Sequence, residues 1–425
     1  MIETINSASK LAGAIRLPGD KSISHRWAMI AALAEGKTTI HGYATGEDCH
    51  STLGILRALG IEVEDGGSEV SIVGKGLDGL SKPSVTLDAG NSGSTIRMMS
   101  GILAGQPFVS RIAGDESLAK RPMQRVMKPL AEMGARITAT HETYPPLEIH
   151  GTKLRAIDYT TPVASAQVKT CVLFAGLFCD GETIVREPMK TRDHTELALQ
   201  MFGAEISSAG RVVTLKGRPR LEAKELTVPG DLSSSAFFLS AALLIPDSNL
   251  VIGGVGLNPT RTALLDYLAG LGAEIRILNV GDQCGELVGD ILVRGRVQRP
   301  GIISGALTAS LIDEIPVLAV LGAATGGLYV RDAAELRVKE TDRIATIAEN
   351  FARAGVEIEV REDGFTVPGH QKFHAAQFDS FGDHRIAMAF AVAGLVADGP
   401  CRIERAEAAS VSFPEFYSTL KSLTV

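Results

Sequence analysis

The chain has 425 residues, of which 45% are hydrophobic and 21% are charged, and its formal net charge is −7. The length suggests two or three domains of roughly 150 residues, and the acidic balance with few aromatic residues argues against nucleic acid as the main partner. No apolar run approaches the roughly 18 residues of a spanning helix and the N-terminus has no signal-peptide pattern, so we expect a cytoplasmic protein that does not bind a membrane.

The first informative stretch is "LPGDKSISHR" (residues 17–26), which leads directly into the apolar run "WAMIAALAEG". Lys21, Ser22 and Arg26 are thereby predicted on the first turns of a core helix. Free backbone N–H groups, the positive end of the helix dipole, hydroxyls and two cations together suit a phosphate or carboxylate. The alternative is that Asp20 or Ser22 caps the helix while the cations are solvated.

A short phrase recurs along the chain: "ALGIEVE" near residue 64, "EMGARIT" near 138, "MFGAEIS" near 207, "GLGAEIRI" near 277 and "RAGVEIEV" near 360. Each phrase closes a stretch with helical periodicity, supplies a glycine in the C-cap region and enters a strand. The predicted helices are residues 51–59, 123–133, 195–202, 261–271 and 343–354. The chain therefore reuses one unit that contains a helix, a glycine stop and a strand.

A second, more apolar helix precedes each of these, at residues 26–36, 94–105, 168–181, 234–246 and 314–327, and residues 384–399 begin a sixth unit. Helices that are apolar on every side are expected to be buried. Six units of roughly 65 to 80 residues, each with two helices and several short strands, predict two domains of three units.

The starts of these buried helices carry polar motifs. Besides "GDKSISHR" they are "GNSGSTIR", "ASAQVKT", "GDLSSS", "LIDEIP" and "GDHR". Repeated small residues, hydroxyls and cations at helix N-termini indicate one anion-binding surface, although capping alone explains one or two of them.

The five cysteines are scattered and include no C-x-x-C pair. Neither a disulfide framework nor a zinc site is indicated, and no other cluster has the spacing of metal ligands. We therefore expect no metal and no cofactor.

In order and spacing, "LPGDKSISHR", "GNSGSTIR", "DESLAKRPM", "SAQVK", "ELRVKETDR" and "GDHRIAM" resemble the EPSP synthase family of enolpyruvyl transferases over essentially the whole chain. The resemblance implies an α/β fold, a two-domain inside-out α/β barrel in which each domain is a three-fold repeat of a βαβαββ-type unit. It places one domain at residues 20–229 and the other at residues 1–19 plus 230–425, with the active site between them. We expect a monomer.

The implied reaction transfers the enolpyruvyl group of phosphoenolpyruvate to the free hydroxyl of shikimate 3-phosphate and releases phosphate through a tetrahedral intermediate. Residues that match the family's contacts to shikimate 3-phosphate are Lys21, Ser22, Arg26, Ser165, Ala166, Gln167, Arg192, Asp313 and Lys339. Ala166 stands where some members have serine, so one hydroxyl contact is missing.

Residues that match the family's contacts to phosphoenolpyruvate are Lys21, Gly93, Arg121, Gln167, Arg343 and Arg385. Arginine suits this task because its planar fork binds a carboxylate or phosphate through two hydrogen bonds. The reaction also needs proton transfer in both directions. The resemblance implies that Asp313, Glu340 and Lys21 are catalytic, whereas Arg97 is open to a ligand role or a structural one.

Two further positions depart from the family pattern. Val411 replaces a lysine that contacts phosphoenolpyruvate in many members, and Met98 replaces a proline. The nearest rival is the enolpyruvyl transferase that acts on UDP-N-acetylglucosamine, whose mobile loop uses a cysteine. The region "GDESLAKRPM" has none, which favours the shikimate enzyme. In this family glyphosate competes for the phosphoenolpyruvate site, and because Gly93 leaves the close approach that an alanine methyl would obstruct, we expect glyphosate to inhibit. A catalytically silent anion-binding protein is the alternative from another class.

Overall fold

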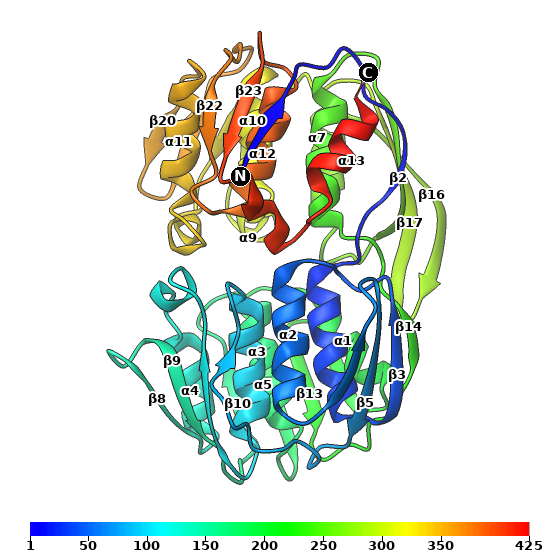
Figure 1. Cartoon of the computed structure of the whole chain (residues 1–425), viewed down its shortest axis with the longest axis vertical. Coiled ribbons are helices and arrows are strands. Elements are labelled where there is room, and N and C mark those ends of the chain that lie inside the picture. The colour runs from blue at the N-terminus through cyan, green and yellow to red at the C-terminus, as the bar shows by residue number, and fades with distance from the viewer. Residues whose placement is uncertain (425) are drawn as a thin grey trace. The chain divides into compact units, whose positions relative to one another are not determined.

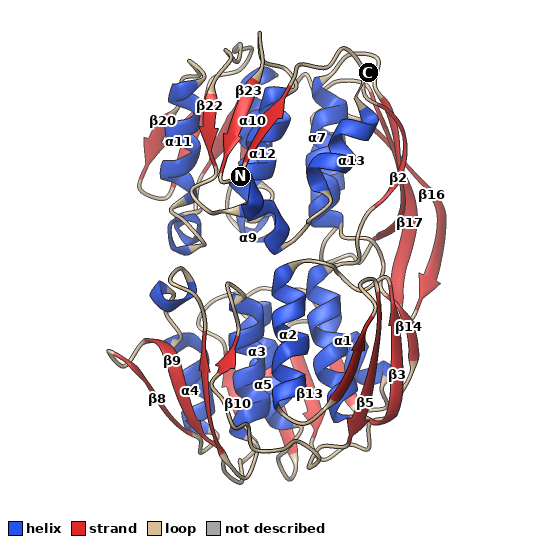
Figure 2. Cartoon of the chain, in the orientation of Figure 1, coloured by secondary structure: helices blue, strands red, loops and turns tan. Residues whose placement is uncertain are grey.

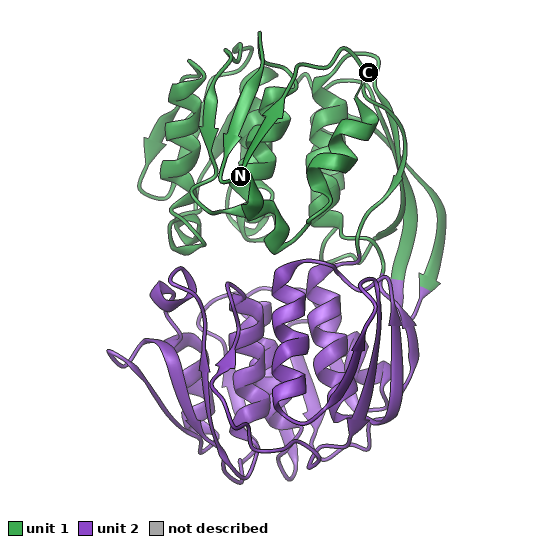
Figure 3. Cartoon of the chain, in the orientation of Figure 1, with its two compact units in different colours: residues 1–18, 229–282, 287–425 green, residues 19–228, 283–286 purple. Residues whose placement is uncertain are grey.

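The computed structural model describes residues 1–424, which form two compact units. Unit 1 comprises residues 1–18, 229–282 and 287–425, and unit 2 comprises residues 19–228 and 283–286 (Figure 3). Each unit has its own hydrophobic core.

Unit 2 contains three copies of a βαβαββ repeat. The first repeat borrows its opening strand from the end of the unit and consists of β14 (Glu225–Thr227), α1 (Lys21–Leu33), β3 (Glu35–His41), α2 (Glu47–Ala58), β4 (Glu62–Asp65) and β5 (Glu69–Lys75). The second consists of β6 (Leu87–Asp88), α3 (Gly93–Ala104), β7 (Val109–Ala113), the short 3-10 helix η1 (Leu118–Lys120), α4 (Gln124–Glu132), β8 (Arg136–Thr140) and β9 (Tyr144–His150). The third consists of β10 (Asp158–Thr160), α5 (Ala166–Gly176), β11 (Glu182–Arg186), α6 (His194–Met201), β12 (Ile206–Ala209) and β13 (Val212–Lys216).

Unit 1 follows the same plan in its first two repeats, and its third repeat departs from it. Its first repeat consists of β2 (Ala12–Arg16), α7 (Leu232–Leu244), β15 (Asn249–Gly256), α8 (Ala263–Gly270), β16 (Glu274–Gln283) and β17 (Glu286–Arg294). The second consists of β18 (Gly301–Ile303), α9 (Ala306–Leu311), α10 (Ile315–Ala324), β19 (Leu328–Val330), η2 (Ala334–Val338), α11 (Arg343–Arg353), β20 (Glu359–Arg361) and β21 (Gly364–Val367). The third consists of β22 (Gln377–Asp379), α12 (His384–Gly394), β23 (Cys401–Glu404), η3 (Ala406–Val411) and α13 (Phe416–Leu423), and the N-terminal β1 (Ile2–Ile5) completes its sheet (Figure 1).

Every repeat makes its own small sheet. Five sheets have four strands, in orders such as β6-β7-β9-β8, and the sixth has the order β1-β23-β22. In each sheet the two strands that flank the buried helix pair in parallel, as β6 and β7 do. Pairings such as β7 with β9 and β8 with β9 are antiparallel. A parallel pair needs a crossover connection, and the buried helix provides it.

The apolar helices α1, α3 and α5 of unit 2 and α7, α10 and α12 of unit 1 are buried in their units, and the sheets lie around the helices (Figure 2). In α1 every residue from Ile23 to Leu33 is buried, and in α7 every residue from Leu232 to Leu243 is buried. Small residues allow this packing: a Cβ on Gly101 of α3 would lie 2.1 Å from the carbonyl oxygen of Cys171 on α5. The predicted α/β fold with inward helices and repeated units is confirmed.

The predicted glycine stops are also confirmed. Gly60, Gly134, Gly203, Gly272 and Gly355 all have φ between 71° and 106°, a region that favours glycine. The "LIDEIP" segment opens the apolar helix α10 as predicted, and the structure adds a short helix, α9, before it. α9 ends at Leu311 and α10 begins at Ile315, so Asp313 lies in the turn between two helices.

Candidate active site

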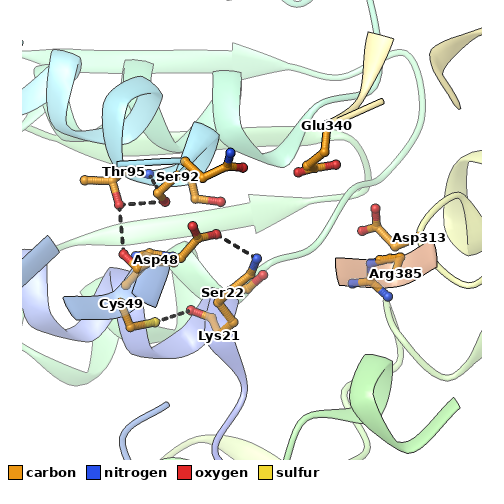
Figure 4. Close-up of polar contacts among 12 residues, drawn as sticks. Lys21, Ser22, Asp48, Cys49, Ser92, Thr95, Asp313, Glu340 and Arg385 are labelled. Atoms are coloured by element: carbon orange, nitrogen blue, oxygen red, sulfur yellow. Dashed lines mark hydrogen bonds and ion pairs between the residues drawn. The ribbon is translucent and has the colours of Figure 1, made fainter. Parts of the chain in front are cut away.

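The start of α1 carries a capped helix end and a paired lysine. Asp20 accepts a hydrogen bond from the backbone N–H of Ile23 at 2.9 Å, so Asp20 is the cap. Lys21 donates from Nζ to Oδ2 of Asp48 in the first turn of α2 at 2.9 Å, with side-chain exposures of 20% and 7% (Figure 4). Capping therefore occurs, but the predicted solvation of the cations is wrong for this lysine.

Arg26 is buried one turn further along α1. Its Nε donates to Oγ1 of Thr195 at 2.7 Å and its Nη2 to Oγ1 of Thr170 at 3.0 Å, while Nη1 donates to the carbonyl oxygen of Ser22 at 2.8 Å. Arg192 donates to the hydroxyl of the same Ser22 at 3.3 Å. Burial, followed by repulsion from Arg192, lowers the pKa of Arg26 to about 10. Arg26 thus donates its hydrogen bonds to neutral oxygens, and Arg192 lies close enough to repel it, which is a favourable arrangement for an anion.

The start of α3 presents an open backbone beside a second arginine. Ser92 caps the helix by accepting from the N–H of Thr95 at 3.1 Å. Arg121 is 6% exposed, and its guanidinium donates to the backbone oxygen of Asn91 at 3.2 Å and to its side-chain oxygen at 2.6 Å. A third donor hydrogen bond from Arg121 reaches Ser117 at 3.0 Å. Asn91 therefore fixes the arginine next to the helix N-terminus.

Gly93 leaves room for this cluster. A Cβ at Gly93 would lie 2.8 Å from Nη1 of Arg97 and 3.4 Å from Nη1 of Arg121. A methyl group here would displace at least one guanidinium group, because real Cβ contacts are not this short.

The start of α5 joins the α3 cluster through a glutamine. Ser165 caps α5 by accepting from the N–H of Val168 at 3.4 Å, and Ala166 is its first residue. Gln167 accepts from Nη1 of Arg97 at 2.9 Å and donates to Oγ of Ser94 at 3.0 Å. Arg97, which the sequence left open, thus has a structural contact: it orients the glutamine amide.

In unit 1, a buried arginine connects three carboxylates. Arg343 is 1% exposed. Its Nε and Nη2 donate to the two oxygens of Asp383 at 2.8 and 3.2 Å, and Nη2 also donates to Glu340 at 2.6 Å. Burial acts to lower the pKa of Arg343, but attraction from Asp383 and Glu340 outweighs it, and the pKa lies above its ordinary value. Within residues 1–424 its Nη1 has no hydrogen-bond partner.

Asp313 lies beside two cations. Its Oδ1 is 3.4 Å from Nζ of Lys339 and 3.7 Å from Nη1 of Arg343. Because Glu340 pairs with the same Arg343, the two predicted catalytic carboxylates share one guanidinium group. Figure 4 shows Asp313 and Glu340 as labelled side chains of this unit.

Arg385 lies in the first turn of α12 and is 9% exposed. Asp383 caps this helix by accepting from the N–H of Arg385 at 2.8 Å, so one aspartate serves both Arg343 and the α12 start. The guanidinium group of Arg385 is 3.8 Å from Glu314, whose Oε1 also accepts from the hydroxyl of Ser233 on α7.

Residues 1–424 contain no group of three or more His, Cys, Asp or Glu side chains arranged to hold a metal ion. In the same part of the chain, no helix has the length and apolar character needed to cross a membrane.

Comparison with known proteins decides the family. A sequence model described as EPSP synthase (3-phosphoshikimate 1-carboxyvinyltransferase) matches residues 5–420. The chain belongs to the EPSP synthase family. The resemblance carried by the motifs is therefore confirmed.

Similar proteins cover the full length. The chain is 65% identical over 424 residues to a 3-phosphoshikimate 1-carboxyvinyltransferase of Solibacter usitatus, covering 100% of both proteins. It is 49% identical to the protein of that name in Geobacillus kaustophilus, covering 98% of this chain and 99% of the relative. Among solved structures, EPSP synthase from Acinetobacter baumannii has a TM-score of 0.87 at 39% identity, with coverage of 100% and 98%. The enolpyruvyl transferase NikO from Streptomyces tendae, at 19% identity and a TM-score of 0.78 with coverage of 99% and 97%, shares the fold.

The residues selected from the family motifs fall into two groups, one in each unit. Unit 2 carries Lys21, Ser22, Arg26, Gly93, Arg121, Ser165, Ala166, Gln167 and Arg192, and unit 1 carries Asp313, Lys339, Glu340, Arg343 and Arg385.

Four supporting residues were not selected from the sequence. Asp48 pairs with the α1 lysine, Asn91 and Asp383 hold arginines, and Glu314 lies near Arg385. Asn91, Asp383 and Glu314 stand inside the quoted motifs, so their position was a usable signal, whereas nothing local distinguishes Asp48.

Proposed function

We propose that this member of the EPSP synthase family transfers the enolpyruvyl group of phosphoenolpyruvate to the 5-hydroxyl of shikimate 3-phosphate, yielding 5-enolpyruvylshikimate 3-phosphate and phosphate for aromatic amino acid biosynthesis. The observation that carries this proposal is the pair of guanidinium groups, buried Arg26 and partly buried Arg192, that meet at Ser22. Two cations close enough to repel each other are stabilised when a phosphate neutralises them.

Shikimate 3-phosphate binds to the unit 2 group of residues through its phosphate and hydroxyls. Ser22, Arg26 and Arg192 contact the phosphate end, and the α5 start supplies Ser165, Ala166 and Gln167. Lys21 reaches both substrates. Asp313 and Lys339 of unit 1, 3.4 Å apart, contact the acceptor hydroxyl and the cyclohexene ring.

Phosphoenolpyruvate carries a carboxylate and a phosphate, which arginine forks suit. Arg121 and the backbone at Gly93 hold it from unit 2, with Gln167 shared between the substrates. Arg343 and Arg385 hold it from unit 1. The Nη1 donor of Arg343, buried and without a hydrogen-bond partner among residues 1–424, is the group that a substrate oxygen satisfies.

The chemistry proceeds by addition and elimination. Asp313 removes the proton from the acceptor hydroxyl as the hydroxyl oxygen bonds to C2 of phosphoenolpyruvate. At the same time C3 of phosphoenolpyruvate gains a proton to become a methyl group. The tetrahedral intermediate then loses a proton from C3 and expels phosphate, which restores the double bond. Glu340 takes part in these proton transfers, and Lys21 stabilises the charge that develops on the phosphate.

The protein works in this account as a cytoplasmic monomer that needs no metal or cofactor. The rival acceptor UDP-N-acetylglucosamine is disfavoured because the "GDESLAKRPM" region lacks a cysteine. A silent anion-binding protein is disfavoured because the set of catalytic residues that the family implies, Asp313, Glu340 and Lys21, is intact.

The test is steady-state phosphate release with both substrates for the wild type, Asp313→Asn and Glu340→Gln. Loss of a general acid or base lowers kcat by roughly 10²–10⁴-fold, with substrate binding retained by calorimetry. A wild type that binds both substrates and releases no phosphate would overturn the proposal in favour of the silent protein. Variants with wild-type kcat would overturn the assigned roles.

A further inference from the structure

Close to the proposed substrate contacts of unit 2 lies a buried cluster of charged side chains that the proposed reaction does not use. Lys169 on α5 is 0% exposed, and its Nζ is 2.9 Å from Oε2 of Glu187 and 2.7 Å from Oε1 of Glu196. The two carboxylate residues are 5% and 6% exposed. We refer to Lys169, Glu187 and Glu196 as the buried charge triad.

The triad joins three segments that carry proposed substrate contacts. Lys169 follows Gln167 on α5. Glu187 immediately follows β11 and accepts a hydrogen bond from the hydroxyl of Thr191, the neighbour of Arg192. Glu196 lies in the first turn of α6, directly after Thr195.

Thr195 extends the connection to α1. Its hydroxyl lies 2.6 Å from the hydroxyl of Thr170, and these two oxygens are the ones that receive Nε and Nη2 of Arg26. Lys169 and Glu196 are therefore sequence neighbours of the two threonines that orient this guanidinium group.

We propose that Lys169 is a positioning residue for shikimate 3-phosphate: by binding Glu187 and Glu196 at once, its ammonium fixes the 187–193 loop and the α6 start, and so holds Arg192 and Arg26 in the geometry that receives the phosphate. This inference rests on the proposed function.

Charge balance supports the same role. The triad has one ammonium and two carboxylates, and Glu196 attracts the Arg26 guanidinium, opposing the repulsion from Arg192. Burial raises the pKa of Glu196, and Lys169 acts against that rise. Lys169 thereby favours the charged form of Glu196, and the attraction of that carboxylate for Arg26 opposes the repulsion between the two cations.

Stability alone is a weak reason for such a cluster. Desolvation of buried charges consumes most of their attraction, and well-packed apolar side chains of similar volume are often as stable. What a buried ion cluster adds is a defined geometry, and here the segments that it orders are those that carry Arg26, Arg192 and Gln167.

The experiment compares wild type, Lys169→Met, the conservative Lys169→Arg, and Leu103→Ala. Leu103 is a fully buried residue of α3 in the same core, and its truncation destabilises unit 2 without touching the triad. For Lys169→Met we expect KM for shikimate 3-phosphate to rise by about tenfold or more, because charge-assisted contacts lose their alignment. KM for phosphoenolpyruvate and kcat at saturation should change by less than about threefold.

Lys169→Arg should recover most of the lost affinity, and Leu103→Ala should melt earlier with an unchanged KM for shikimate 3-phosphate. A merely structural lysine would give Lys169→Met and Leu103→Ala the same pattern, a lower melting temperature with both KM values unchanged, and that result would overturn the proposal.

Amide hydrogen exchange of residues 187–197 in the ligand-free protein separates this inference from the proposed function. Faster exchange there in Lys169→Met, and not in Leu103→Ala, supports the positioning role even if the wild type turns over another acceptor. Unchanged exchange would refute it, whereas a wild type without turnover on shikimate 3-phosphate refutes only the function.

Discussion

Replacement of Arg343 by lysine keeps one positive charge and removes the fork. Arg343 makes three hydrogen bonds to carboxylates, at 2.8 and 3.2 Å to Asp383 and at 2.6 Å to Glu340. A lysine Nζ at this buried position can retain about one of them. The loss of two, at about 1.5 kcal/mol each for hydrogen bonds to charged groups, lowers the free energy of unfolding by about 3 kcal/mol.

For a unit of this size that loss lowers the melting temperature by roughly 6–12 °C. The substrate effect is separate, because lysine cannot also present the Nη1 donor, and KM for phosphoenolpyruvate should rise roughly tenfold to a hundredfold. The assays are calorimetric melting and steady-state phosphate release at saturating shikimate 3-phosphate.

Arg186→Lys is the matched control. Arg186 makes the same two-bond contact with Asp158, at 2.8 Å for each bond, but both side chains are nearly half exposed. Exposed ion pairs contribute little, so this variant should melt and turn over like the wild type. An Arg343→Lys protein with wild-type melting and wild-type KM for phosphoenolpyruvate would refute the reasoning about the buried fork.

Four further outcomes are expected. Lys21→Met should abolish turnover and lower the free energy of unfolding modestly, since Asp48 loses its ion pair with Lys21. Near-normal phosphate release by this variant would remove Lys21 from the mechanism. Glyphosate should inhibit in competition with phosphoenolpyruvate. Gly93→Ala should weaken the binding of both glyphosate and phosphoenolpyruvate, because its methyl group displaces a guanidinium group. Equal inhibition of the wild type and Gly93→Ala by glyphosate would contradict this. Burial, and then repulsion from Lys21 and a neighbouring arginine, hold the pKa of His25 well below 6.5. The unfolded chain therefore binds the proton where the folded chain does not, and the free energy of unfolding falls as pH drops below 6.5, by up to about 1.4 kcal/mol per pH unit. Denaturant melts of His25→Asn should show a shallower dependence of this free energy on pH, and a slope identical to that of the wild type would argue against the reasoning. Arg385→Lys should raise KM for phosphoenolpyruvate by roughly tenfold with little change for shikimate 3-phosphate, and a large gain from Val411→Lys would show that the arginines do not saturate the site.

The local features of this fold are predictable from the sequence. Helix periodicity, glycine stops such as Gly60 and caps such as Asp20 depend on residues a few positions apart, and the structure contains them. The buried character of α1 and α7 follows from runs that are apolar on every side.

Long-range side-chain pairing is not predictable in the same way. Arg343 and its partner Asp383 are 40 residues apart, and Arg26 and Thr195 are 169 apart. Such contacts depend on how repeats pack, which no local pattern encodes. The same holds for β14, which closes the first sheet of unit 2 by pairing with β3 from the other end of the unit.

The central claim is tested most directly by product analysis after incubation of the wild-type protein with phosphoenolpyruvate and each of two acceptors. Phosphorus NMR and mass spectrometry should show equal amounts of inorganic phosphate and 5-enolpyruvylshikimate 3-phosphate with shikimate 3-phosphate, and no transfer to UDP-N-acetylglucosamine. Transfer to the nucleotide sugar instead, or no transfer to either acceptor, would contradict the account.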